Sequence, residues 1–323
     1  MRLATFNLES FGEDRFRPER LGRRLEALGP RLNELAADIL CLQEVNAQKP
    51  KGGKIREFSA LEFLLAETPY AGFHRAASLR EDLQGPMDRH NLLVLSRYPI
   101  EKVRVLHHAH VTPPLWRPGS VAAQGADDCS VRFDRPLLQV RLDIGGGKPL
   151  HVFVVHLRAP IASALPGGKL GAMAWKSTAA WAEGYFIASM KRVAQALDLR
   201  LAVDAILDED TDALIAVAGD FNATGDASAL RLLFADPEDT GNPALACRQL
   251  FQLDAALPRE VRKTVVHNGR GQTLDHILAS GPLKQRMADI SVFNADLADE
   301  VIDEGTDAEN GSFHAAVCAT FEL

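Results

Sequence analysis

Short apolar runs alternate with longer stretches of helical periodicity along most of the chain. Leucines three and four residues apart predict an amphipathic helix over residues 18–37, and similar patterns predict helices over 58–66 and 172–207. The apolar runs predict strands over residues 2–7, 39–44, 92–96, 103–106, 137–144, 150–156, 214–219, 263–267, 274–279, 290–293 and 316–321. Helical crossovers between some strands, and a Gly145-Gly146-Gly147 hairpin turn between two others, predict an α/β protein with mixed sheets.

The domain organisation predicted for the 323 residues is a single domain over residues 1–323, because no repeat, low-complexity tract or convincing linker is present. The longest segment without a period covers residues 107–136, and loops of more than about 12–15 residues are usually functional or disordered. This segment contains His107, His108 and His110. Their spacing matches no usual metal-ligand set, so a solvated loop or an edge strand is the prediction there.

Composition narrows the class of protein. The 36 basic and 43 acidic residues give a formal net charge of −7, whereas proteins that grip DNA through its phosphates usually have a basic surface. Tight binding of nucleic acid is therefore disfavoured, although a local basic cleft is compatible with this balance. The four cysteines lack zinc-type spacing and favour a reducing compartment. With no charged leader and no apolar stretch of the ~20 residues that cross a bilayer, we expect a soluble, cytoplasmic protein without a membrane span.

The strongest chemical signal is Gly219-Asp220-Phe221-Asn222, which directly follows an apolar run over residues 214–218. Residues i and i+2 of a strand point the same way, so Asp220 and Asn222 are expected to reach one rim of a sheet together. The carboxylate can hold a metal or take a proton from water, and the amide can hold an anionic oxygen without titrating. This pairing suits hydrolysis of a phosphate ester, although a lone Gly-Asp pair after a strand is more often an ordinary turn.

Five other strand ends carry matching polar residues, and the set is more informative than any one member. Taken singly, each residue is typical of a surface carboxylate, a capping residue or a structural histidine. These strand ends carry Asn7 with Glu9, Glu44, His156, Asp275 with His276, and His314. Six such ends in one chain favour a shared active site over unrelated polar residues.

In chain order, these residues form a series of short motifs. The motifs are Thr5-Phe6-Asn7, Leu42-Gln43-Glu44-Val45, Leu95-Ser96-Arg97-Tyr98-Pro99-Ile100, Val155-His156-Leu157, Gly219-Asp220-Phe221-Asn222, Leu274-Asp275-His276-Ile277 and Ser312-Phe313-His314. From Thr5 to Phe321 the chain resembles the endonuclease/exonuclease/phosphatase superfamily, which has the deoxyribonuclease-I-like fold. The resemblance implies a four-layered α/β sandwich, in which two mixed β-sheets pack face to face with helices outside. It also implies hydrolysis of phosphoesters that depends on a divalent metal.

The resemblance further implies which residues bind the metal. Glu44 corresponds to the principal metal-binding residue and Asn7 to an asparagine beside the metal, and Glu9 could add an outer-sphere carboxylate. The expected cofactor is Mg²⁺ or Mn²⁺, since a hard cation of this kind keeps several waters and needs only one or two carboxylates. Asn91 lies where related enzymes carry an asparagine near the phosphate.

The catalytic roles follow from the same resemblance. Asp220 would orient or deprotonate the attacking water, and Asn222 would hold the scissile phosphate. His156 would contact the phosphate, stabilising the developing charge or protonating the leaving oxygen. Asp275 would orient His314, and a paired carboxylate raises the pKa of an imidazole. Asp220 and His314 both stay open as the general base.

The C-terminal motif departs from the family pattern, which is usually Ser-Asp-His. Phe313 stands at the position of the Asp and cannot bind a metal, which puts a second metal, or the geometry of the first, in question. Asp303, Asp307 or Glu309 could take over through a different loop path, or the other carboxylates could hold one ion without help. Reduced or lost activity is a third alternative, but the rest of the set remains and an active enzyme is the prediction.

Three functions are compatible with these residues. The first is a metal-dependent phosphodiesterase that uses activated water, acting on nucleic acid, a phospholipid or a small diester. The second is a phosphomonoesterase of a small molecule or nucleotide, in which Lys169 and Arg192 could contact an anion and Trp181 and Tyr185 could form a stacking wall. Trp175 and Phe186 belong to the same candidate wall, but on a long helix Trp175, Trp181 and Phe186 would more often pack in a core. The third is a non-catalytic binding module on the same fold, with Phe313 marking lost metal binding.

Overall fold

Two six-stranded β-sheets form the centre of the molecule in the computed structural model, which describes residues 1–12, 18–82, 84–121, 128–303 and 311–323. The first sheet has the order β15-β16-β1-β2-β4-β3 and the second the order β11-β14-β10-β9-β8-β5. The strands of the first sheet are β1 (Arg2–Phe11), β2 (Ile39–Val45), β3 (His74–Ala77), β4 (Asn91–Ser96), β15 (Met287–Phe293) and β16 (Ala316–Phe321). Those of the second are β5 (Ile100–Leu106), β8 (Leu137–Leu142), β9 (Leu150–His156), β10 (Leu214–Asp220), β11 (Leu250–Gln252) and β14 (Asp275–Ser280).

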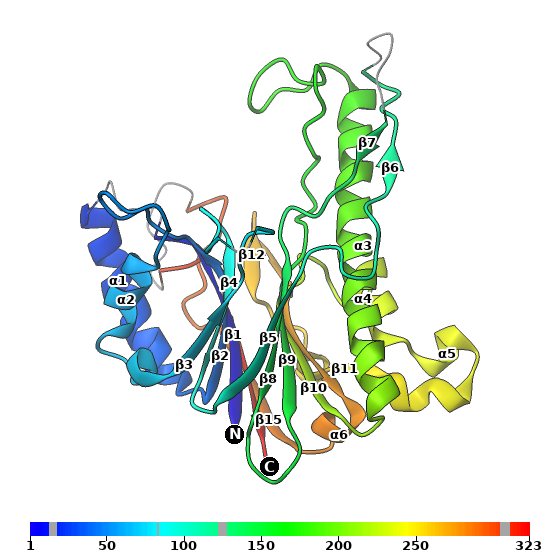
Figure 1. Cartoon of the computed structure of the whole chain (residues 1–323). Coiled ribbons are helices and arrows are strands. Elements are labelled where there is room, and N and C mark those ends of the chain that lie inside the picture. Colours follow the sequence, from blue (N-terminus) through cyan, green and yellow to red (C-terminus); the bar gives the residue numbers. More distant parts are fainter. Residues whose placement is uncertain (13–17, 83, 122–127, 304–310) are drawn as a thin grey trace.

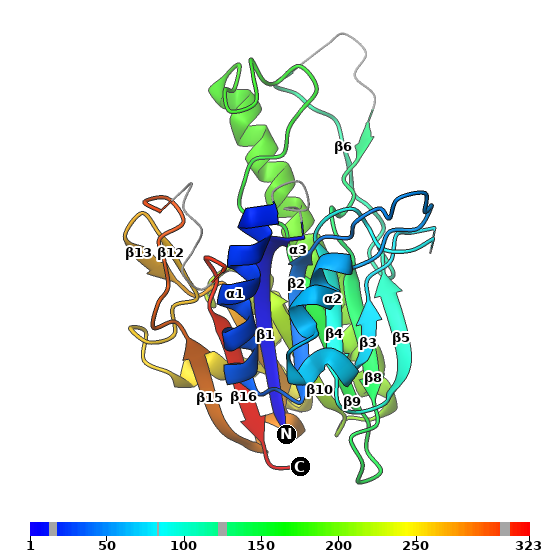
Figure 2. The same ribbon diagram turned by 90° about the vertical axis from the view of Figure 1, so that its left-hand side faces the viewer.

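Helices cover the outer face of each sheet, as Figures 1 and 2 show. The helices α1 (Pro18–Leu35) and α2 (Ser59–Leu65) pack on the first sheet through apolar side chains such as Leu32 and Leu61. The helices α3 (Thr178–Glu209) and α4 (Ser228–Phe234) pack on the second. A third apolar cluster fills the space between the two sheets. Each sheet pairs strands both parallel and antiparallel, so the predicted four-layered sandwich with mixed sheets is confirmed.

Shorter elements connect these layers. They are η2 (Pro69–Gly72), α5 (Pro237–Thr240), η3 (Pro243–Arg248), η4 (Leu253–Ala256), α6 (Gly281–Lys284), and the hairpins β6 (Leu115–Trp116) with β7 (Cys129–Ser130) and β12 (Val265–His267) with β13 (Arg270–Gln272). No helix within the described ranges combines the length and apolar character needed to cross a membrane.

Several predicted elements differ in extent from the observed ones. The helix predicted over 172–207 begins at Thr178, where the Ser177 side chain caps it by accepting a hydrogen bond from the N–H of Ala180. The strand predicted over 263–267 is reduced to the short hairpin strand β12. The strands β3 and β11 were not predicted, because four and three residues are too few to show a period.

The strand ends that carry the predicted chemistry meet at one edge of the sandwich. β9 and β10 run parallel, and His156 is the register partner of Asp220 at their carboxyl ends. β14 runs antiparallel to β10, so its first residue, Asp275, also lies opposite Asp220. Gly219 permits this arrangement, because its φ is +151° and a Cβ there would lie 2.0 Å from the carbonyl oxygen of Val155.

Candidate active site

Asp220 lies at the centre of the site and is almost completely buried. Its Oδ1 accepts a hydrogen bond from the N–H of Asn222 (2.7 Å), and its Oδ2 accepts from the amides of Asn222 (3.0 Å) and Asn7 (3.1 Å). Burial raises the pKa of the Asp220 carboxyl to about 7, with a further contribution from the negative charge of Asp275. A carboxyl that exchanges a proton near neutral pH is suited to general base catalysis.

Asp275, which is buried, and His314, which is partly buried, form a pair beside Asp220. The His314 Nδ1 lies 2.9 Å from the Asp275 Oδ2. Burial alone would lower the pKa of His314, but the charge of Asp275 and its hydrogen bond outweigh burial and raise that pKa to about 10. His314 is therefore an imidazolium at neutral pH and cannot serve as a base there. With these pKa values, Asp220 is the better proton acceptor of the two at neutral pH.

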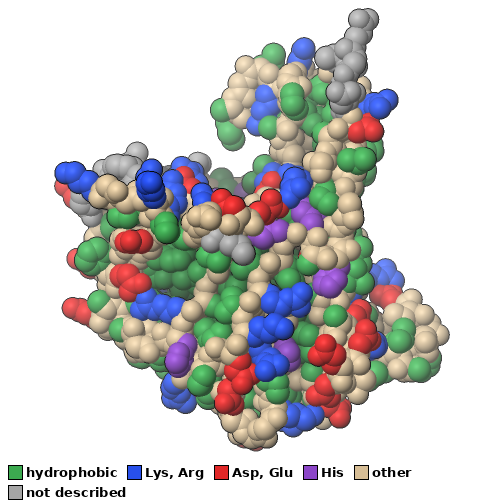
Figure 3. Space-filling model, viewed as in Figure 1, with side chains coloured by type: hydrophobic (Ala, Val, Ile, Leu, Met, Phe, Trp, Pro, Cys, Tyr) green, Lys and Arg blue, Asp and Glu red, His purple; other side chains and the backbone are tan. Residues whose placement is uncertain are grey.

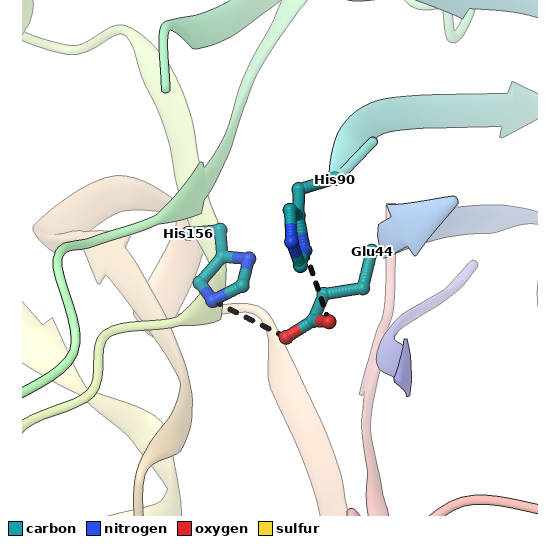
Figure 4. A group of neighbouring side chains, drawn as sticks. All are labelled: Glu44, His90 and His156. Carbon is teal, nitrogen blue, oxygen red and sulfur yellow. Dashed lines mark hydrogen bonds and ion pairs between the residues drawn. The ribbon is translucent and has the colours of Figure 1, made fainter. Parts of the chain in front are cut away.

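A second group joins the two sheets and consists of Glu44, His90 and His156 (Figure 4). The Glu44 Oε2 lies 3.0 Å from the His90 Nδ1, and the Glu44 Oε1 lies 3.6 Å from the His156 Nε2. Burial acts to raise the pKa of Glu44, but the hydrogen bond from His90, with the nearby positive charge of Arg135, holds it well below its usual range. Glu44 is thus ionised, which a metal-binding carboxylate must be.

His156 links the Glu44 group to Asp220. Its Nε2 lies 3.3 Å from the Asp220 Oδ2, and its ring is buried. Burial, with the nearby charge of Arg135, lowers the pKa of His156 well below the usual range, so the imidazole is neutral. A neutral ring can offer a nitrogen to a cation or donate one N–H to an oxygen.

The backbone is strained where these side chains converge. Glu9, Ser10, Glu44, His90 and Asn222 all have φ between 46° and 58°, in the left-handed region that non-glycine residues avoid. Such residues cluster at functional sites, where the surrounding structure holds them in place.

The segment Ser312–His314 docks on β1 through its backbone and small side chains. The Ser312 hydroxyl donates to the carbonyl oxygen of Asn7 (2.8 Å), and the N–H of Phe313 donates to the Glu9 Oε2 (2.9 Å). Burial raises the pKa of Glu9. Glu9 therefore binds the chain at position 313, so the contact that Phe313 makes here needs only its backbone.

Of the carboxylates considered as substitutes at position 313, Asp303 lies among the described residues. The Asp303 Oδ2 accepts a hydrogen bond from the N–H of Asp299 (2.9 Å) and so closes a local turn. Asp307 and Glu309 lie outside the described residues.

Two predicted substrate-binding amides are engaged by the protein itself. Both amide hydrogens of Asn222 have partners, because its Nδ2 donates to the Leu157 carbonyl oxygen (3.1 Å) as well as to Asp220. The Asn91 Nδ2 donates to the carbonyl oxygens of Val45 and Met87, and its Oδ1 accepts from the N–H of Met87. In this geometry Asn222 positions Asp220 and Asn91 holds a loop, and neither amide points freely at a phosphate.

Sequence reasoning missed two residues of the site, His90 and Arg135. His90 comes directly before β4 and contacts Glu44, whereas the sequence analysis had assigned a role in the site to its neighbour Asn91. Arg135 lies before β8, close enough for the charges of Glu44 and Asp220 to raise its pKa, although burial is the larger effect and lowers it. Its Nε and Nη1 are buried and have no hydrogen-bond partner among the described residues.

Three histidines that do not join the site, His107, His108 and His276, have structural partners. His276 points away from Asp275, and its Nδ1 lies 3.0 Å from the Asp254 Oδ2. In the long loop, the His107 Nε2 lies 2.9 Å from the carbonyl oxygen of Leu79, and the His108 Nε2 accepts from the N–H of Phe133. His107 and His108 thus both contact the backbone of neighbouring loop segments.

Comparisons with known proteins place this geometry in a family. The sequence matches the Endonuclease/Exonuclease/phosphatase family over residues 4–294. No curated protein matches the sequence. Among solved structures, truncated TDP2 of Caenorhabditis elegans is 16% identical with a TM-score of 0.58, and the match covers 100% of this chain and 97% of that one.

Two further structures show the same fold. TDP2 of D. rerio, complexed with a single strand DNA product, is 13% identical with a TM-score of 0.56, covering 100% of this chain and 99% of that one. An AP endonuclease from Archaeoglobus fulgidus is 18% identical with a TM-score of 0.54, covering 100% of both chains. With the family match over most of its length, the chain belongs to the endonuclease/exonuclease/phosphatase family.

Proposed function

We propose that this chain is a divalent-metal-dependent phosphodiesterase that uses an activated water as nucleophile. The observation that carries the proposal is the triad Asp220, Asp275 and His314, in which a buried carboxyl has a pKa of about 7 and an imidazolium a pKa of about 10. A base and an acid with separated pKa values are the usual signature of hydrolytic catalysis. Membership of the family and the nucleic-acid ligand of the D. rerio TDP2 structure support the same reaction class.

The residues divide the work of hydrolysis among them. Asp220, held by the amides of Asn7 and Asn222, takes the proton of the attacking water. His314 stays protonated through Asp275 and relieves negative charge on the phosphate or gives its proton to the leaving oxygen. The guanidinium of Arg135 offers two free, buried nitrogens to the phosphoryl oxygens.

The donor atoms of Glu44, His90 and His156 fit a divalent cation, because they lie within 4.8 Å of one another. A cation held there would act as a Lewis acid toward the phosphate oxygens. Asn7, whose amide lies 3.3 Å from the Glu44 Oε1, orients that carboxylate. Glu9 accepts a hydrogen bond from the N–H of Phe313 and so holds the segment that carries His314 against β1.

The test is hydrolysis of bis-p-nitrophenyl phosphate and p-nitrophenyl phosphate side by side, with Mg²⁺, Mn²⁺ or excess chelator. We expect turnover of the diester that chelator abolishes and added metal restores. Turnover of the monoester alone would instead establish a phosphomonoesterase. If the folded protein turned over neither, the non-catalytic module would be favoured, and a Phe313→Asp variant that gained activity would trace the loss to that position.

The histidines of the metal group predict a preference between metals. Imidazole nitrogen suits first-row transition metals, whereas Mg²⁺ prefers oxygen ligands only. We expect His90→Asn to weaken Mn²⁺ binding about 10- to 100-fold, the range seen when groups around a metal are removed. Mg²⁺ binding should change much less, and titration calorimetry with each metal measures both.

His107→Asn is the matched control for this prediction, because that imidazole contacts a backbone carbonyl outside the group. Equal loss of affinity for both metals in His90→Asn would mean that His90 acts only by orienting Glu44.

A further inference from the structure

The helix α3 continues well beyond the sandwich, and its upper half stands above the sheet edge that carries the site (Figure 1). In the lower half, Ala196, Leu199 and Val203 pack on β9 and β10. Steps of three, four and seven residues keep positions on one side of a helix, so this side continues upward to Arg192, Tyr185 and Trp181. The space-filling view shows a hollow between this arm and the body of the molecule (Figure 3).

Trp181 and Tyr185 form an exposed aromatic pair on that side. Their ring centroids lie 5.9 Å apart with an angle of 34° between the planes, and the residues are 48% and 40% exposed. The other aromatic residues of the arm are already engaged. Trp116 packs against Phe186, and Lys169 lies over the ring of Trp175. Large aromatic side chains left in solvent beside a site are typical of ligand-binding surfaces.

Arg192 connects the aromatic pair to the catalytic residues. Its Nη1 donates to the carbonyl oxygen of Asn222 (3.4 Å) and to that of Arg158 (3.2 Å), and the Tyr185 side chain lies near it. Within the described residues, no carboxylate forms an ion pair with this guanidinium. The positive charge is therefore available to an anion lying between Asn222 and the rings.

We propose that this face of α3, formed by Trp181, Tyr185 and Arg192, binds single-stranded nucleic acid next to the scissile phosphodiester. The two rings stack on unpaired bases, and Arg192 neutralises a neighbouring phosphate. This inference rests on the proposed function, which places the reacting phosphodiester at Asp220. It adds that the groups attached to this phosphodiester are nucleotides of a single strand. A single strand fits better than a duplex, because paired bases are stacked on each other and cannot reach the rings.

A membrane is the other surface that exposed aromatic residues could contact. The observations favour nucleic acid, since the rings lie on the same side of the helix as Arg192. The Arg192 guanidinium donates to the carbonyl oxygen of Asn222, and Asn222 in turn donates to Asp220. The net charge of −7 is a property of the whole chain, whereas the positive charge beside the rings is local and comes from Arg192.

The experiment compares the native protein with a Trp181→Ala/Tyr185→Ala double variant. The kcat/KM for a single-stranded oligonucleotide should fall about 10- to 100-fold, whereas the kcat/KM for bis-p-nitrophenyl phosphate, which is too small to span site and face, should change less than about twofold. Binding of the labelled oligonucleotide, measured by fluorescence anisotropy with excess chelator to prevent turnover, should weaken in parallel. Trp181→Phe and Tyr185→Phe keep a ring and should retain most of the binding.

Phe63→Ala is the matched control, since this exposed aromatic residue lies on α2, which covers the other sheet. Unchanged oligonucleotide binding in the double variant, or native binding of duplex in preference to single strand, would overturn the proposal. So would binding of phospholipid vesicles that the double variant loses. If the native protein hydrolyses bis-p-nitrophenyl phosphate but does not bind the oligonucleotide, only this inference fails; if it binds the oligonucleotide without hydrolysing either, the proposed function fails instead.

Discussion

Replacing Asp220 with Asn is expected to lower kcat for phosphodiester hydrolysis by about 10²- to 10⁴-fold, the usual contribution of a general base. The amide has nearly the same shape as the carboxylate but cannot take a proton from water. Metal binding should persist, because Glu44 and its histidines belong to a different group of donors. Steady-state kinetics with bis-p-nitrophenyl phosphate, together with calorimetric titration of Mn²⁺, measures both quantities.

The pH profile gives this prediction a second readout. The pKa of Asp220 is raised to about 7, so the carboxyl is protonated and inactive below that pH and becomes a base above it. A bound cation favours the ionised form, which places the rising limb of kcat/KM at or below about pH 7. The pKa of His314 is raised to about 10, so the falling limb appears only when the imidazolium loses its proton there. Residual activity of Asp220→Asn should lack the rising limb and keep the falling one.

Asp289→Asn is the control, because this carboxylate is exposed on β15, the edge strand of the other sheet. A profile in which Asp220→Asn keeps both limbs and most of its activity would show that another group is the base.

The strand-end residues of the site could be predicted because the signals that mark a strand and its end lie within a few residues of sequence. Side chains alternate along a strand, and parallel strands present their carboxyl ends at one edge, so apolar runs that end in Asp220, His156 and Glu44 imply a common location. The same reasoning wrongly placed His276 in the site. Neighbouring positions of a strand face opposite sides, and only Asp275 of that pair faces the site.

The loop residues and the orientation of amides could not be predicted, because they depend on contacts between distant segments. Arg135 reaches the site from a segment that shows no period, and nothing local indicates that its nitrogens stay unpaired. Asn222 occupies the expected position, but its amide is taken by Leu157, which lies 65 residues away in the chain. The backbone contact of Phe313 with Glu9 likewise joins residues that are 304 positions apart in the sequence, so it exists only in the folded chain.

The helical arm illustrates a similar limit. A periodic pattern predicts that residues form a helix, but it does not show where the neighbouring layer ends. Trp181 and Tyr185 have the spacing of core residues on α3, and they are exposed because the sheet stops below them. Their exposure is thus a property of the tertiary structure, which the pattern alone cannot distinguish from packing in a core.

Replacing Arg135 with Ala is expected to lower kcat/KM for the diester by about 10²- to 10³-fold, the range found when a donor to a developing oxyanion is removed. The reason is the pair of buried, unpartnered nitrogens on a guanidinium close to Glu44 and Asp220. Burying a charged donor without a partner costs free energy, so its presence is best explained by a substrate anion that supplies the missing bonds. Arg135→Lys should recover only part of the rate, because an ammonium cannot make the paired contacts of a planar guanidinium.

Arg132→Ala provides the matched control, since this side chain is exposed in the same segment and pairs with Glu81. The two variants should also differ in stability. The Arg135→Ala variant loses a cation that offsets the charges of Glu44 and Asp220, which is destabilising, but it also loses two unsatisfied buried donors, which is stabilising. The Tm of this variant should therefore change little, although its kcat/KM falls. A large drop in Tm with a normal kcat/KM would show instead that Arg135 serves to balance the charges of Glu44 and Asp220. The phosphate contact would then have to come from His314.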